Sequence, residues 1–61
     1  MYENLKKLMV EKYGSLKKTA EVLYCNQGRL EDRLDGYISW GAFDIMTIKN
    51  DLGYDLDERK D

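Results

Sequence analysis

The side chains best suited to chemistry gather in one short stretch, where Asn26, Gln27 and Arg29 follow the only cysteine of the sequence. Amide and guanidinium groups form hydrogen bonds to ligands. With no histidine and a lone Cys25, a zinc site would have to be built from carboxylates, and no acid–base or nucleophile constellation is visible. These residue types predict a binding protein and not an enzyme, without a metal or other cofactor. Cys25 is expected to be a small buried hydrophobe.

The elements that must position these residues lie in the stretch 16–36. Its apolar residues recur at helical spacing on both sides of a short polar break: Leu16, Ala20, Leu23, Leu30 and Leu34. Asn26 can accept a hydrogen bond from the free amides that open the second helix. Ala20 is small enough for two helices to cross closely. The pattern predicts a helix-turn-helix, whose second helix can enter the major groove of DNA.

The chain before this stretch is predicted to form a helix over residues 2–12. Its shared apolar face consists of Tyr2, Leu5, Leu8 and Met9. Gly14 supplies a left-handed position that ends this helix, and Ser15 is a good N-cap for the next one. In the same way Gly36 is expected to end the third helix.

A fourth helix is predicted after a short connection at residues 37–41. Ser39 is its expected N-cap, and the helix runs to Leu52 with Gly53 as its C-cap. Its apolar positions fall mostly on one stripe: Ala42, Ile45, Met46, Ile48 and Leu52. Because the connection contains strand-forming residues, a short hairpin there is the alternative.

The aromatic residues of this second half are expected to serve packing. Trp40 and Phe43 are predicted to cover the core, with a dimer contact as their other use. Tyr54 or Leu56 is expected to fold back onto the core. The charged end at 57–61 is expected to fray.

Length and charge limit the class of protein. At 61 residues the chain is expected to form one domain over 1–61, an all-α bundle of four to five helices with an acidic tail at 54–61. The net charge is −2, whereas nucleic-acid binders are usually basic. The negative charge is concentrated in the second part of the chain. Residues 1–36 carry seven basic and six acidic side chains, and residues 37–61 carry three basic and six acidic side chains.

The amino-terminal residues through Lys7 are charged and begin no apolar run. We therefore expect neither a signal peptide nor a membrane span. The expected location is the cytoplasm.

Two blocks of sequence resemble a known family. The run GSLKKTAEVL at 14–23, followed by Gln27, Leu30, Leu34 and Gly36, resembles the helix-turn-helix of phage Cro and repressor proteins and their xenobiotic-response-element-like relatives. The run FDIMTIKNDLGYDLD at 43–57 is similar to that family's closing helix, which commonly ends in Leu-Gly, two residues, then Leu-Asp. The two blocks cover over half the chain. The resemblance implies a lambda-repressor-like or Cro-like fold and a homodimer that regulates transcription from operator DNA.

The resemblance also implies roles for individual residues. Lys17 and Lys18 match positions near the DNA backbone, and residues 26–29 match the tip of the reading helix. Gln27 can bond an adenine edge, and Arg29 can bond guanine or a phosphate. The implied contact residues are Lys17, Lys18, Asn26, Gln27, Gly28, Arg29 and Arg33. The family usually has glycine where this chain has Tyr24, so the turn must either strain or adopt another geometry.

The acidic side chains of the second motif helix leave two other interpretations open. In one, the fold has become a protein-interaction module, such as a phage-type antirepressor or a DNA-mimicking inhibitor, that docks through Glu31, Asp32 and Asp35. In the other, the basic residues form a solvated, salt-bridged surface, with Arg29 pairing Asp32 at i,i+3.

Overall fold

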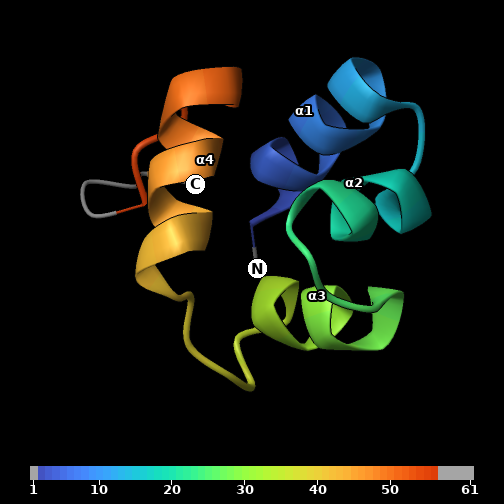
Figure 1. Ribbon diagram of the computed structural model, residues 1–61, viewed down its shortest axis with the longest axis vertical. Helices are drawn as coiled ribbons and strands as arrows, with labels where there is room; N and C mark the ends of the chain where they lie inside the picture. Colours follow the sequence, from blue (N-terminus) through green and yellow to red (C-terminus); the bar gives the residue numbers. More distant parts are fainter. Residues whose placement is uncertain (1, 57–61) are drawn as a thin grey trace.

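The computed structural model describes residues 2–56, which form four helices. They are α1 (Glu3–Tyr13), α2 (Leu16–Val22), α3 (Gln27–Leu34) and α4 (Ala42–Leu52). Figure 1 shows α1, α2 and α3 stacked along one side of the molecule and α4 along the other. No strand occurs within the described residues, so the all-helical prediction is confirmed and the hairpin alternative at 37–41 is wrong. The predicted fraying end at 57–61 lies outside the described residues.

The break between α1 and α2 is made as the sequence predicts. Gly14 has a φ of 98°, a conformation that favours glycine, and its N–H donates to the Val10 carbonyl at 2.9 Å. The Ser15 hydroxyl then accepts from the Lys18 N–H at 3.1 Å. The buried Thr19 hydroxyl donates to the Ser15 carbonyl at 2.8 Å, so this end of α2 leaves no polar group of Thr19 unbonded.

The start of α4 differs from the prediction. The N-cap is Gly41 and not Ser39, because the buried Asp44 carboxylate accepts from the Gly41 N–H at 3.2 Å. The carbonyl of Ser39 instead accepts from Nε of Arg33 at 3.2 Å. The end of α4 is as expected, at Leu52 with Gly53 in the left-handed conformation.

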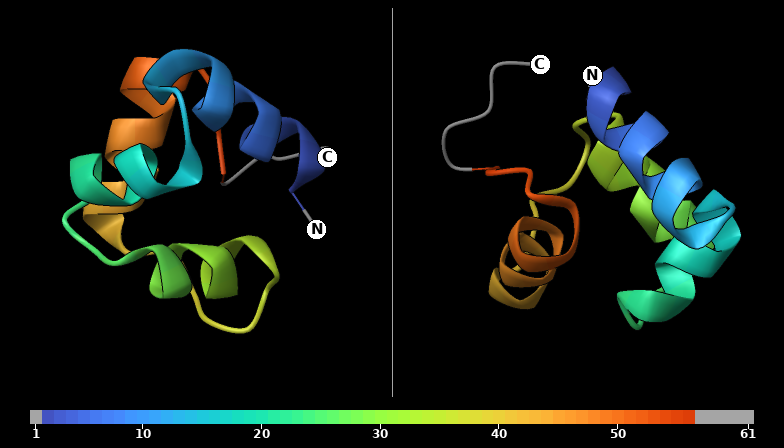
Figure 2. Two further views of the ribbon diagram at one scale, coloured as in Figure 1. Left: turned by 90° about the vertical axis from the view of Figure 1, so that its right-hand side faces the viewer. Right: turned by 90° about the horizontal axis from the view of Figure 1, so that it is seen from above.

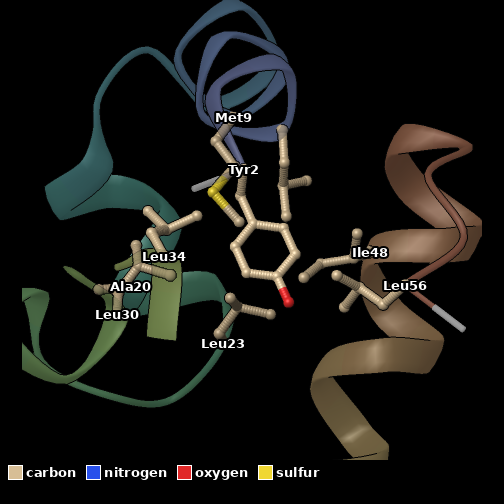
Figure 3. Packing of buried hydrophobic residues seen from close by; sticks show 9 residues of the cluster. Tyr2, Met9, Ala20, Leu23, Leu30, Leu34, Ile48 and Leu56 are labelled. Atoms are coloured by element: carbon tan, nitrogen blue, oxygen red, sulfur yellow. The ribbon is translucent and has the colours of Figure 1, made fainter. Parts of the chain in front are cut away.

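The hydrophobic core joins all four helices. Its buried members are Tyr2, Leu5, Met9, Ala20, Leu23, Leu30, Leu34, Ile48 and Leu56. Figure 3 shows the Tyr2 ring between the apolar side chains of α1, α2 and α3 and the pair formed by Ile48 and Leu56. Leu56 therefore folds back onto the core, as expected. Trp40 meets the edge of the core in a T-shaped contact with Tyr2, with ring centroids 5.8 Å apart.

The buried face of α4 is rotated from the predicted stripe. Asp44 and Ile48 are its buried residues, whereas Met46 is 62% exposed and Ala42 is exposed as well. Phe43 is half exposed and touches the Tyr24 ring, so the prediction that it covers the core is wrong. Polar contacts as well as apolar ones attach α4 to the other helices.

One of these polar contacts joins the C-terminal ends of α1 and α4. The Tyr13 hydroxyl donates to a carboxylate oxygen of Asp51 at 2.7 Å. Partial burial, and then this hydrogen bond and the nearby negative charge, raise the pKa of Tyr13 to about 12. Within residues 2–56 no helix combines the length and apolar character needed to cross a membrane.

Candidate functional site

The predicted site lies at the junction of α2 and α3, which four residues connect. Ala20 and Leu23 from one side and Leu30 and Leu34 from the other are all buried in the core. These four side chains bring the two helices together, as the apolar spacing predicts. Helix α3 lies along an edge of the molecule in Figures 1 and 2, and no other helix covers its outer side.

The turn takes the strained form of the two geometries left open by the sequence. Tyr24 has a φ of 57°, which costs a residue with a Cβ about 1–2 kcal/mol. Its N–H donates to the Glu21 carbonyl at 3.2 Å, and the next N–H, of Cys25, donates to the Ala20 carbonyl at 2.9 Å. These bonds hold the chain reversal in place. The Tyr24 ring is 85% exposed and packs on Phe43, with centroids 5.5 Å apart.

The tip of α3 projects into solvent. The Asn26 side chain accepts from the Arg29 N–H at 2.8 Å, so Asn26 is the N-cap that the sequence predicts. Residues 26–29 are all exposed. Capping uses the side-chain oxygen of Asn26, so Asn26 keeps its amide N–H donors for a ligand beside the side chains of Gln27 and Arg29.

The Gln27 side chain is already oriented within α3. Its Nε2 donates to a carboxylate oxygen of Glu31 at 2.8 Å. One N–H and the carbonyl oxygen of the Gln27 amide remain for a ligand. This i,i+4 contact could have been anticipated from the sequence, because residues four apart are neighbours on a helix.

The basic residues divide into two kinds. Lys17, Lys18 and Arg29 are exposed, and within residues 2–56 none of them forms an ion pair. Arg33 is half-buried: its Nε lies 3.5 Å from Asp44 and donates to Ser39 at 3.2 Å. The structure therefore uses Arg33 to hold the 35–41 connection and the start of α4. The i,i+3 pair of Arg29 with Asp32 is not formed among the described residues.

An open, polar groove runs beside the tip. It is lined by residues 23–26 together with Arg29, Arg33 and Asp44. Cys25, expected to be buried, is half-buried in this groove with its thiol free. Asp44 is the member of the groove that the sequence reasoning missed. Its signal was its position three residues after Gly41, the spacing at which an acidic side chain can bond the N-cap amide.

Carboxylates occupy the remainder of the outer side of α3. Glu31, Asp32 and Asp35 are all exposed. Glu31 and Asp35 also line a small hollow with Lys6 of α1. The outer side of α3 thus changes from amide and guanidinium groups at its start to carboxylates at its end.

No match to this chain was found among protein-family models, curated proteins or solved structures. Within residues 2–56 no group of three or more His, Cys, Asp or Glu side chains is placed to hold a metal ion. A function for this site is therefore inferred from the arrangement of its own residues.

Proposed function

We propose that this protein is a small cytoplasmic transcriptional regulator that binds operator DNA as a homodimer, with α2 and α3 acting as a helix-turn-helix. The observation that carries the proposal is the exposed tip at 26–29, set on the buried apolar junction of the two helices. Helix α3 has eight residues and is therefore about 12 Å long, a length that the major groove accommodates. The role is non-enzymatic.

Each exposed group at the tip has a matching partner on a duplex. Gln27 offers one donor and one acceptor to a base edge, and Arg29 can give two hydrogen bonds to guanine or bond a phosphate. Gly28 places no side chain between the helix and the bases, so the backbone can approach closely. Lys17 and Lys18, on the first turn of α2, are suited to the phosphates of the flanking backbone.

The number of exposed cations limits the electrostatic part of binding. Of the basic residues predicted to contact DNA, Lys17, Lys18 and Arg29 are left for phosphate, because Arg33 is paired with Asp44. Each phosphate contact contributes a slope of about −0.9 to the dependence of log affinity on log salt. We therefore expect a slope of about −3 per protomer or shallower.

The test is fluorescence anisotropy on duplexes from the region upstream of the protein's own gene, at about 50 and 200 mM salt. The double variant Lys17→Ala, Lys18→Ala should make the slope shallower by about 2. Lys49→Ala is the matched control, since Lys49 is exposed and lies in the last turn of α4, at the end of that helix farther from α3 (Figure 1). Absence of both specific and salt-sensitive binding by the wild type at the lower salt would refute the proposal.

The exposed carboxylates of α3 favour one other candidate, a protein-interaction module that docks on a basic partner such as a DNA-binding protein. Asp32→Lys with Asp35→Lys separates the two, because neither side chain bonds Gln27. The double change should strengthen DNA binding if the duplex is the ligand, because it removes two repulsive charges and adds two attractive ones. It should abolish docking if a basic partner is the ligand.

A further inference from the structure

We infer that Glu31 is a positioning residue that makes Gln27 read adenine and reject guanine, an inference that rests on the proposed DNA-binding function. Glu31 would then contribute to specificity without touching a base. Charge alone would predict that Glu31 weakens DNA binding, because its carboxylate repels phosphates.

The chemistry of the contact fixes how the Gln27 amide is turned. The two side chains lie one helical turn apart on α3 and are joined by the 2.8 Å hydrogen bond from Nε2 to the carboxylate. An ionised carboxylate only accepts hydrogen bonds, so the nitrogen of the amide and not its oxygen must face Glu31. The opposite orientation would place two acceptors against each other.

The number of donors left on Gln27 then decides which base it fits. A glutamine amide has two N–H donors and one acceptor oxygen, and Glu31 takes one of the donors. The remaining donor and acceptor match adenine, which presents an acceptor at N7 and a donor at N6 in the major groove. Guanine presents two acceptors there, N7 and O6, and would need both N–H groups of Gln27.

Making two hydrogen bonds to guanine would therefore require Gln27 to leave Glu31. The carboxylate would lose its hydrogen bond and would lie close to two guanine acceptors and to phosphates. Both Gln27 and Glu31 are exposed, so they are free to approach a duplex together. The penalty falls on guanine alone, which is how a residue that contacts no base can alter base preference.

The inference is tested by selecting binding sites from randomised duplexes with four proteins: wild type, Glu31→Gln, Glu31→Ala and Gln27→Ala. The wild type should prefer adenine to guanine about tenfold at one position, and Gln27→Ala should lose that preference. Glu31→Gln keeps an acceptor oxygen four residues from Gln27 but adds N–H donors, so it no longer fixes how the Gln27 amide is turned and should give a preference between those of the wild type and Glu31→Ala. Glu31→Ala should reduce it to about threefold or less while overall affinity stays equal or rises.

The contact itself is read by NMR on the free protein. One of the two Gln27 side-chain amide protons should be shifted downfield in the wild type, less so in Glu31→Gln, and not in Glu31→Ala. Circular dichroism of each variant shows whether the helices are retained.

Two results would overturn this inference alone. The first is a Glu31→Ala protein whose base preferences contradict a positioning role: either it keeps the adenine preference, or it loses a preference for cytosine at another position, and the latter loss would make Glu31 a base contact. The second is a Gln27 amide signal that does not change with Glu31. A wild type that binds no duplex, with the Gln27 signal still dependent on Glu31, would instead refute the proposed function and with it the base-reading role.

Discussion

Two parts of this small domain are held in place by different kinds of contact: the junction of α2 and α3, and the attachment of α4 to the other helices. Helices α2 and α3 meet through buried apolar side chains, among them Leu30 and Leu34, from elements only four residues apart. Helix α4 is attached through a few apolar side chains and two polar contacts, Tyr13 with Asp51 and Arg33 with Asp44. The difference implies that the site is held by nonspecific apolar burial, whereas the placement of α4 depends on individual bonds with defined geometry.

Truncating the apolar junction should have the largest effect. Leu34 is fully buried, so Leu34→Ala is expected to lower the free energy of unfolding by about 2–5 kcal/mol. That is most of what a core of this size supplies, about 3–5 kcal/mol. Urea denaturation followed by circular dichroism measures the loss.

Met46→Ala is the matched control for this change, because it also shortens an apolar side chain but one that is 62% exposed. Its expected effect is within about 0.5 kcal/mol. If Leu34→Ala were no more destabilising than removal of the Asp44 carboxylate, the contrast between the two attachments would fail.

Removing that carboxylate should have the next largest effect. Asp44→Ala deletes the acceptor for the Gly41 N–H and leaves the half-buried Arg33 guanidinium without its charge partner. We expect a loss of about 2–3 kcal/mol. Asp44→Asn keeps an oxygen for the Gly41 amide and should lose only about 1 kcal/mol, measured by the same denaturation. Equal losses in the two variants would show that the ion pair carries the whole effect.

The hydrogen bond at the other end of α4 should contribute less and should depend on pH. Tyr13→Phe removes the donor to Asp51 and should cost about 1 kcal/mol near neutral pH. The pKa of Tyr13 is raised from 10.0 to about 12, so the folded state keeps a proton that the unfolded chain releases. The stability from this group is therefore full below pH 10 and is lost as the pH rises toward 12.

Comparing the two proteins isolates Tyr13 from the other tyrosines. The stability difference between wild type and Tyr13→Phe should be constant up to about pH 9 and should shrink above pH 10, as seen by denaturation at a series of pH values. A stability difference that stays the same at high pH would mean that folding does not raise the pKa of Tyr13.

The same contrast explains what could be predicted from the sequence. The helix breaks at Gly14 and Asn26 and the apolar junction were predicted, because caps and i,i+4 spacing act between residues close in the chain. The Tyr13 bond to Asp51 spans 38 positions, and no local pattern indicates it. Without such contacts the rotation of α4 about its axis could not be known, so the predicted apolar stripe includes Met46, which the structure exposes.

The candidate site divides in the same way. Its exposed tip and the Asn26 cap follow from local signals, and the left-handed Tyr24 was one of two geometries that the sequence left open. The engagement of Arg33 with Asp44 could not be predicted, because it depends on where the 35–41 connection brings the start of α4. Because of this long-range pair, Arg33 is engaged within the protein, whereas the other predicted contact cations face solvent.

The smallest change, Gly28→Ala, should have opposite effects on folding and on the proposed binding. Gly28 lies in the first turn of α3 with ordinary helical backbone, and an added Cβ would lie 3.4 Å from the Asn26 side-chain oxygen, an ordinary contact. Alanine should therefore raise the free energy of unfolding by about 0.5–1 kcal/mol. In the proposed complex the same methyl group stands between α3 and the base edges and should weaken DNA binding.

Denaturation and anisotropy on the same preparation distinguish these effects. A variant that is more stable but binds DNA less tightly is the expected result, since the added methyl group fits the free protein and obstructs only the complex. Asp32→Ala is a matched control, because it also places alanine on the exposed side of α3 but removes a repulsive charge, so it should bind DNA at least as well as the wild type. If Gly28→Ala bound DNA as tightly as the wild type, the tip of α3 would not approach the bases closely. The DNA-binding surface would then lie elsewhere on the protein.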